Sequence, residues 1–331
     1  MVTLQKPADR DFVILNLTDP QLSSTEWETD TMQRILLKNT LRELVNRTKP
    51  DLITVCGDIA WAGETYSYEC FTSYVDSFGI PWAPIFGNHD VQAGYEKTCE
   101  AADILIRGKN CLFEKGPREL GCGNYVIRIM EGECPVTALI LMDSHDSRPP
   151  LPHEMDVDTV WDEISPRQID WYRNETELLK SQGYRDSALL LHIPIYAYRD
   201  AFHAASIKGF SYNHYEPQSC SYSAFWNEGY GDTFGVNYEK ICSHPYDNGF
   251  FKVIGELDHT RHVLCGHDHV NNASINYRGV RLTYVTKLGA GCYYDKRMNG
   301  GTVLTVGSHG IKDIRHEYVS AEKVLYEEED N

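Results

Sequence analysis

Residues 83–90 read Ala-Pro-Ile-Phe-Gly-Asn-His-Asp, and this stretch is the clearest indication of the fold. The apolar run Ala83–Phe86 predicts a short buried strand. The glycine that follows lets the backbone approach another group closely, and Asn88, His89 and Asp90 then offer an amide, an imidazole and a carboxylate. The stretch therefore predicts an α/β protein with polar chemistry directly after a strand.

Four further segments also place polar groups after a predicted strand. Ligands of open α/β sheets bind outside the carboxyl ends of the strands, so we expect these segments to converge on one crevice. Carboxylate, amide and imidazole groups bind ions such as Mn, Fe and Zn, and no cysteine shares the segments. Each segment alone could be a turn or a core histidine, and only the ordered set favours a metal centre. The segments are Thr18-Asp19-Pro20-Gln21, Gly57-Asp58, His192 and Gly266-His267-Asp268-His269.

Short apolar runs alternate with helical patterns over the first 200 residues, which is typical of βαβ units and a mostly parallel or mixed sheet. After residue 270 a period of two residues predicts antiparallel strands, with a turn at Arg278-Gly279. We expect one domain over residues 1–331, with an irregular insertion at about 199–247 and an acidic tail at 327–331. The predicted strands are Phe12–Leu17, Leu52–Cys56, Ala83–Phe86, Val136–Met142, Ala188–His192, His262–Cys265, Ala273–Tyr277, Val280–Thr286, Thr302–Val306 and Ile311–Tyr318, and the predicted helices are Asp30–Thr48 and one from Ser165 to about Gln182.

The charge of the chain excludes some classes of partner. There are 31 Lys and Arg residues against 48 Asp and Glu, a formal net charge of −17, so the chain lacks the basic surplus that nucleic-acid binding requires. No apolar run approaches the roughly 18 residues that span a membrane, and the N-terminus has no signal-peptide pattern. We therefore expect neither nucleic acid nor a membrane as a partner.

The ten cysteines are spread without a CxxC pair, which indicates reduced thiols and a cytoplasmic location. A secreted protein is the alternative. The cysteine count is even, and Asn46-Arg-Thr and Asn174-Glu-Thr match the N-glycosylation pattern.

The ordered motifs resemble those of the calcineurin-like metallophosphoesterase family, and the resemblance extends from residue 19 to residue 269. Asp143-Ser144, Gln168-Ile-Asp-Trp171, His192-Ile-Pro and Gly266-His-Asp-His-Val-Asn271 are similar to segments of its small purple-acid-phosphatase-like branch. The resemblance implies an α/β fold of a particular kind, a four-layer α/β/β/α sandwich of two mixed β-sheets, with two metal ions at the strand ends.

The resemblance also implies a role for each motif residue. Asp58 would bridge two divalent or transition metal ions, which could be Mn, Fe or Zn. His89 would act beside the substrate as a general acid or as a positive group on the phosphate, and Asp90 would orient His89 by accepting its other ring proton. The other ligands would be Asp19, Gln21 and His269 for the first ion and Asn88, His192 and His267 for the second.

Two positions depart from the family pattern. Gln21 replaces a histidine of most members, so the first site should be weaker or should prefer a harder ion such as Mn. Trp61 stands where true purple acid phosphatases have the tyrosine that binds ferric iron. We therefore expect neither the ferric-tyrosinate colour nor an obligatory ferric ion.

The implied activity is hydrolysis of a small phosphomonoester by attack of a metal-bound hydroxide, without a covalent intermediate. One alternative is a phosphodiesterase acting on a cyclic nucleotide, a dinucleotide or a lipid head group, and another is an inactive metal-binding or interaction module. Aromatic residues of the insertion and of the last loop either cap the site or pack the insertion onto the core. They include Tyr196, Tyr198, Tyr212, Tyr215, Phe225, Trp226, Tyr293 and Tyr294, with His214 among them.

Overall fold

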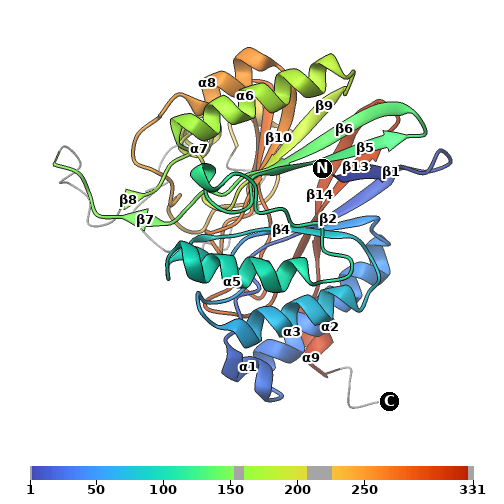
Figure 1. Cartoon of the computed structure of the whole chain (residues 1–331), viewed down its shortest axis with the longest axis vertical. Coiled ribbons are helices and arrows are strands. Elements are labelled where there is room, and N and C mark those ends of the chain that lie inside the picture. Colours follow the sequence, from blue (N-terminus) through green and yellow to red (C-terminus); the bar gives the residue numbers. More distant parts are fainter. Residues whose placement is uncertain (1, 153–159, 207–225, 327–331) are drawn as a thin grey trace.

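The computed structural model describes residues 2–152, 160–206 and 226–326. Two β-sheets pack face to face, and helices cover the outer face of each sheet (Figure 1). This arrangement confirms the four-layer sandwich predicted from the motifs. The predicted tail at 327–331 lies outside the described residues.

The larger sheet has seven strands and the smaller has five. In the larger sheet, β6, β9, β10 and β12 run parallel, and in the smaller sheet β2, β3 and β4 do so. The strand order in the larger sheet is β1 (Val2–Gln5), β5 (Tyr125–Glu131), β6 (Cys134–Leu141), β9 (Asp186–Leu190), β10 (Thr260–Cys265), β12 (Val280–Tyr284), β11 (Ser274–Tyr277). The order in the smaller sheet is β14 (Gly310–Tyr318), β13 (Gly300–Gly307), β2 (Phe12–Leu17), β3 (Leu52–Cys56), β4 (Trp82–Ile85). A separate two-stranded ribbon consists of β7 (Ser147–Arg148) and β8 (Val160–Trp161).

The alternation of side chains along β6 explains the two cores. Leu139 and Leu141 point between the sheets and belong to the core shared with the smaller sheet. Ala138 and Ile140 point the other way and pack beneath the outer helices. Because both faces of this strand are covered, its sequence is a nearly continuous apolar run, as expected for a buried parallel strand.

The helices form the two outer layers (Figure 1). Helix α6 begins as predicted, with Ser165 as N-cap, Pro166 in the first turn and Gln168 completing a capping box. The smaller sheet is covered by α2 (Met32–Thr48), α3 (Thr65–Asp76) and α5 (Tyr95–Ile106), with α1 (Ser24–Glu28) and α9 (Ala321–Tyr326) packed against them, and the larger sheet is covered by α6 (Pro166–Ser181), α7 (Ala197–Ala205) and α8 (Phe250–Leu257).

All ten predicted strands are present, with ends that differ by at most two residues. Strands β1 and β5 were not predicted, and neither were the helices α3 and α5. The predicted irregular insertion begins within α7, so its first residues are helical, and residues 207–225 lie outside the described residues. Within the described ranges, no helix is both long and apolar enough to cross a lipid bilayer.

Candidate metal centre

The loops that follow β2, β3, β4, β9 and β10 meet at one edge of the sandwich. The backbone joins them directly, since Asp19 N donates to Gly57 O at 3.1 Å and Gly266 N donates to His192 O at 3.1 Å. Residues separated by up to 250 positions are thereby brought into one cluster. The seven predicted ligands, Asp19, Gln21, Asp58, Asn88, His192, His267 and His269, are all buried in it.

The ring of His192 is oriented by the backbone. Its Nδ1 lies 2.7 Å from Cys56 O and donates to this carbonyl, so the Nε2 lone pair points the other way. Nε2 lies 3.1 Å from Asn88 Oδ1 and 3.3 Å from Asp58 Oδ2. The Nε2 atom and the two oxygens therefore converge on one point, where either a proton on Nε2 or a bound cation holds them together.

The same arrangement occurs around His269. Its Nδ1 donates to Tyr293 O at 2.8 Å, which turns the Nε2 lone pair toward Asp19 Oδ1 at 3.2 Å. One potential ligand atom from each of Asp19, Asp58 and His269 lies within 4.8 Å of the others. The distances suit a single ion shared by these residues.

Two predicted ligands have buried polar atoms without any hydrogen-bond partner among the described residues. They are both side-chain amide atoms of Gln21 and the Nε2 of His267. Burying such atoms unsatisfied is costly, so their presence at the same cluster indicates that they bind something that is not part of the chain. The donor set and the unsatisfied atoms together fit two divalent ions.

The backbone is strained at four of these residues. Asp19, Gln21, Asp58 and His267 have φ values of 54°, 44°, 49° and 78°, in the left-handed region that non-glycine residues rarely occupy. Strain of this kind persists where the surrounding structure imposes it and is concentrated at functional sites.

Two glycines allow the loops to approach so closely. A Cβ atom at Gly87 would lie 2.3 Å from Asp58 Oδ1, and one at Gly57 would lie 2.6 Å from His192 Nδ1. Gly57 also has a φ of 84°. The predicted close approach of the backbone at Gly87 is therefore an approach to Asp58.

The pKa values of the histidines reflect the uneven distribution of charge. Burial disfavours the charged form of His192, but the carboxylates of Asp58 and Asp19 and the Cys56 carbonyl together outweigh burial and raise the pKa of His192 to about 10. Burial lowers the pKa of His267 to about 3, and the charge of His192 adds to this effect. The ammonium of Lys287 is buried behind the cluster and donates to Asp19 O at 2.6 Å.

The model of calcineurin-like phosphoesterases matches residues 12–271 of this chain. The chain belongs to this family. It is 26% identical over 279 residues to the Arabidopsis thaliana protein named "Probable inactive purple acid phosphatase 14", covering 75% of this chain and 61% of that protein. It is 24% identical to "Probable inactive purple acid phosphatase 29" of the same plant, covering 76% and 63%. This metallophosphoesterase thus spans about three fifths of the length of these relatives.

Two solved structures have the same fold. A dimetal phosphatase from Danio rerio is 11% identical with a TM-score of 0.53, covering 93% of this chain and 99% of that one. A purple acid phosphatase from yellow lupin is 13% identical with a TM-score of 0.53, covering 94% and 52%. These two likenesses show the fold of the chain.

His89 lies at the edge of this metallophosphoesterase centre, half-buried. Its backbone N–H donates to Asp58 Oδ1 at 2.9 Å, and its ring packs against Trp61 with the centroids 4.5 Å apart. Its Nδ1 lies 3.1 Å from Gln92 Oε1, which orients the imidazole and leaves Nε2 free.

Asp90 does not have the role expected for it. Its carboxylate does not accept the ring proton of His89, and Gln92 holds that position instead. Asp90 accepts hydrogen bonds from the Tyr68 hydroxyl at 2.6 Å and from Gly87 N at 2.8 Å, as well as from Ile59 N and Ala60 N. Asp90 is the third residue of a one-turn helix, and its carboxylate bonds back to the N–H of the N-cap residue Gly87. It therefore faces backbone donors rather than the preceding side chain.

The aromatic residues named from the sequence divide into two groups. Tyr198 is buried and donates to Val263 O at 2.8 Å, and Trp226 packs on Phe202, so both join the insertion to the core. Tyr293 instead stacks on the His269 ring, with centroids 4.3 Å apart, and is 43% exposed. Tyr196 and Tyr294 are half-buried, and Tyr212, His214, Tyr215 and Phe225 lie outside the described residues.

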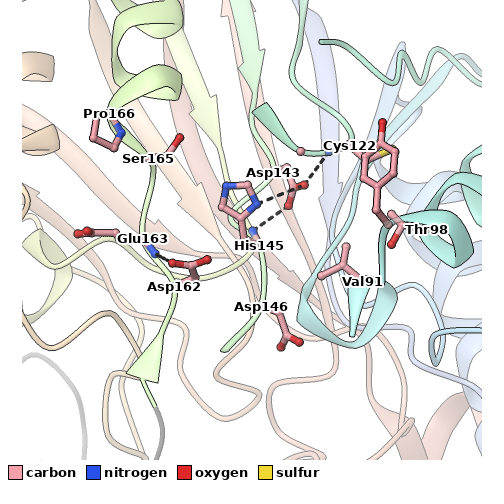
Figure 2. A pocket seen from close by; sticks show the side chains of 12 residues that line it. Val91, Thr98, Cys122, Asp143, His145, Asp146, Asp162, Glu163, Ser165 and Pro166 are labelled. Atoms are coloured by element: carbon pink, nitrogen blue, oxygen red, sulfur yellow. Dashed lines mark hydrogen bonds and ion pairs between the residues drawn. The ribbon is translucent and has the colours of Figure 1, made fainter. Parts of the chain in front are cut away.

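A cavity of about 380 Å³ lies beside the metal centre, between the end of α4 (Asn88–Val91) and the start of α6 (Figure 2). Val91 forms part of one wall, and His145 and Asp146 form part of another. Burial raises the pKa of Asp146, and the charges of His89 and Asp58 also act on it, so this wall is within electrostatic reach of the centre. Sequence reasoning missed His145, although it follows a predicted strand as the other site histidines do.

Proposed function

We propose that this metallophosphoesterase hydrolyses a phosphomonoester with two divalent ions held by its seven buried ligands. One observation carries the proposal: the Nδ1 atoms of His192 and His269 face backbone carbonyls, and their Nε2 atoms lie within 3.3 Å of carboxylate or amide oxygens that belong to the predicted ligands. Asp19, Gln21 and His269 would hold the first ion, Asn88, His192 and His267 the second, and Asp58 would contribute to both.

The bound ions would supply Lewis acidity at the phosphate and lower the pKa of water. The chain itself contributes the rigid positions of the ligands and the proton for the leaving group. Protonated His89 can give its Nε2 proton to the departing alcohol oxygen while Nδ1 keeps its hydrogen bond to Gln92. No nucleophilic side chain is needed.

Alanine substitution at Asp58 or Asn88 tests this assignment. Hydrolysis of p-nitrophenyl phosphate, assayed with added Mn²⁺ or Zn²⁺, should be lost in both variants, and the metal content of the purified protein should fall from about two ions per chain. Asp313→Ala is the matched control, because Asp313 is exposed on β14. Turnover that survives either site substitution would overturn the proposed roles.

A diester substrate is the second candidate. One relative that supports it is the Xenorhabdus bovienii protein named "Probable cyclic nucleotide phosphodiesterase XBJ1_0953", which is 30% identical over 90 residues, 26% of this chain. Parallel assays with p-nitrophenyl phosphate and bis-p-nitrophenyl phosphate distinguish the two. A higher kcat/KM for the diester would favour this candidate.

The third candidate is a metal-binding module without activity. It is supported by the word "inactive" in the names of the plant relatives and by Gln21 in place of a histidine. Protein that carries two ions and hydrolyses none of the mono- and diesters would favour it, whereas turnover would exclude it.

A further inference from the structure

His145 occupies a strand end that the metal centre does not use. Strand β6 ends at Leu141, and its loop carries Asp143, His145 and Asp146 along the wall of the 380 Å³ cavity. Figure 2 shows the His145 ring in the middle of the cavity, between Asp162 and Glu163 on one side and the α4–α5 segment on the other. The imidazole is half-buried and reachable from the cavity.

A buried amide fixes which nitrogen of His145 carries a hydrogen. The Nε2 of Gln168 donates to Asp143 O at 2.6 Å and to Asn124 Oδ1 at 3.2 Å, so its Oε1 is the acceptor end. This oxygen lies 2.7 Å from His145 Nε2, which must therefore donate to it. In the neutral ring Nδ1 is then an acceptor, and its nearest charged neighbour is Asp143 Oδ2, at 3.7 Å.

The backbone is also built around this ring. His145 has a φ of 61°, in the left-handed region, and its N–H donates to Asp143 Oδ1 at 2.8 Å. A Cβ atom at Gly121, whose φ is 102°, would lie 2.9 Å from His145 Cε1 and 2.3 Å from Asp143 Oδ2. A strained residue held by a buried hydrogen-bond network is typical of a functional position.

The polar groups of the cavity wall are mainly acceptors. Four carboxylates line it, those of Asp143, Asp146, Asp162 and Glu163, and none of the described residues that line it is Lys or Arg. Some of this capacity is used: Asp143 accepts from Cys122 N, Asp162 lies 4.0 Å from Arg148, and Glu163 lies 3.6 Å from His244. The Asp146 carboxylate and His145 Nδ1 keep most of their capacity to accept hydrogen bonds. The wall can therefore receive hydrogen bonds and repels anions.

We propose that this cavity holds the alcohol part of the substrate and that His145 is a specificity-determining residue. It selects an organic group that carries hydrogen-bond donors, such as hydroxyl or ammonium, and no negative charge. The inference rests on the proposed function, because Val91, which lines the cavity, belongs to α4, the helix that carries the proposed proton donor His89. Its basis is the fixed Nδ1 acceptor, the acidic wall and the position of the cavity beside α4.

Two substrates of nearly equal size test the inference. Glycerol 3-phosphate and 3-phosphoglycerate have the same carbon chain and differ in a hydroxymethyl group against a carboxylate. We expect kcat/KM of the unmodified enzyme to favour glycerol 3-phosphate by at least about tenfold, the effect of one hydrogen bond gained and one repulsion avoided. Equal values, or a preference for 3-phosphoglycerate, would overturn the proposal.

His145→Ala should lower kcat/KM for glycerol 3-phosphate about tenfold more than kcat/KM for p-nitrophenyl phosphate, mainly through KM, because the nitrophenyl group has no hydrogen-bond donor for Nδ1; the metal content should be retained. His309→Ala is the matched control, since His309 is exposed at the β13–β14 turn. An equal loss with both substrates would mean that His145 is only structural and would contradict the assignment.

Asp146→Asn gives a second test that keeps the size of the side chain. It should reduce the discrimination against 3-phosphoglycerate several-fold, and an unchanged ratio of the two kcat/KM values would contradict the argument from the acidic wall.

The ¹⁵N chemical shifts of the His145 ring should show Nε2–H in the unmodified protein, and the opposite tautomer would remove the acceptor on which the inference depends. Failure of the proposed function is distinguishable, because p-nitrophenyl phosphate would then not be hydrolysed by any variant, including the unmodified enzyme.

Discussion

The hydroxyl of Tyr68 donates a 2.6 Å hydrogen bond to the carboxylate of Asp90, and both groups are buried. Through Ile59 N and Gly87 N the same carboxylate joins the loop that carries Asp58 to the loop that carries His89. A carboxylate of the Gly-Asn-His-Asp motif thus holds together the two loops that carry Asp58 and His89 and does not contact the His89 ring.

Asp90→Ala should therefore lower both stability and metal binding. Removing the acceptor leaves several backbone donors buried and unsatisfied, and each lowers the free energy of unfolding by roughly 1–3 kcal/mol. Thermal unfolding and metal content measure the two effects. Tyr68→Phe removes one donor only and should cost about 1 kcal/mol while metal content is retained. An Asp90→Ala variant that binds two ions as well as the unmodified protein would contradict the positioning role.

Gln21→His should raise the affinity of the first site for Zn²⁺ by roughly tenfold, because imidazole binds borderline metals better than an amide oxygen does. The amide of Gln21 is buried with both polar atoms without a partner among the described residues, and its backbone N–H donates to Asp58 O at 3.1 Å, so the residue belongs to the loop that contacts the Asp58 loop. Calorimetric titration of metal-free protein with Zn²⁺ measures the change. Equal affinities in the two proteins would show that Gln21 is not a ligand.

His89→Ala should lower kcat for alkyl phosphates by about 10²–10³-fold and much less for p-nitrophenyl phosphate, whose leaving group needs little protonation. Gln92→Ala removes only the partner of Nδ1 and should have a smaller effect in the same direction. Single-turnover rates with both substrates provide the comparison. A loss that is equal for the two leaving groups would argue against a general acid at this position.

The contribution of His316 to the free energy of unfolding should fall as the pH decreases from about 6.5 to about 4. Burial lowers the pKa of His316 to about 4, and its neutral ring is fully bonded: Nε2 donates to Asn272 O at 2.7 Å, and Nδ1 accepts from Thr302 Oγ1 at 2.9 Å. In this pH window the unfolded chain binds a proton on this residue that the folded chain excludes, so His316 favours unfolding by on the order of 3 kcal/mol at the lower limit.

Urea unfolding at several pH values measures this slope. His316→Gln removes the titrating ring and should flatten the curve between pH 4 and 6.5, although His262, whose pKa burial also lowers to about 4, should keep part of it. The control substitution His309→Gln changes an exposed histidine and should leave the slope unchanged. A His316→Gln curve that is as steep as that of the unmodified protein would exclude this origin.

The amino-acid sequence by itself determined ten of the twelve strands of the two large sheets and the ordered motifs from which the metal ligands are proposed. Apolar runs and glycines act locally: a run such as Leu52–Cys56 can be buried only as a strand, and Gly87 permits a close approach whatever lies opposite. Because the carboxyl ends of parallel strands meet at one edge, polar residues after several strands could be assigned to one site before their contacts were known.

Only the tertiary structure decided what the remaining polar groups do. Asp90 is adjacent to His89 in the chain, but its partners come from loops and a helix 22–31 residues earlier, apart from Gly87. His145 Nδ1 is an acceptor because Gln168, on α6, accepts the hydrogen of Nε2, and Gln168 is itself oriented by Asn124 from the loop before β5. Strand pairing and helix docking create such contacts between distant residues, so the local pattern of the sequence cannot specify which group a side chain will bind.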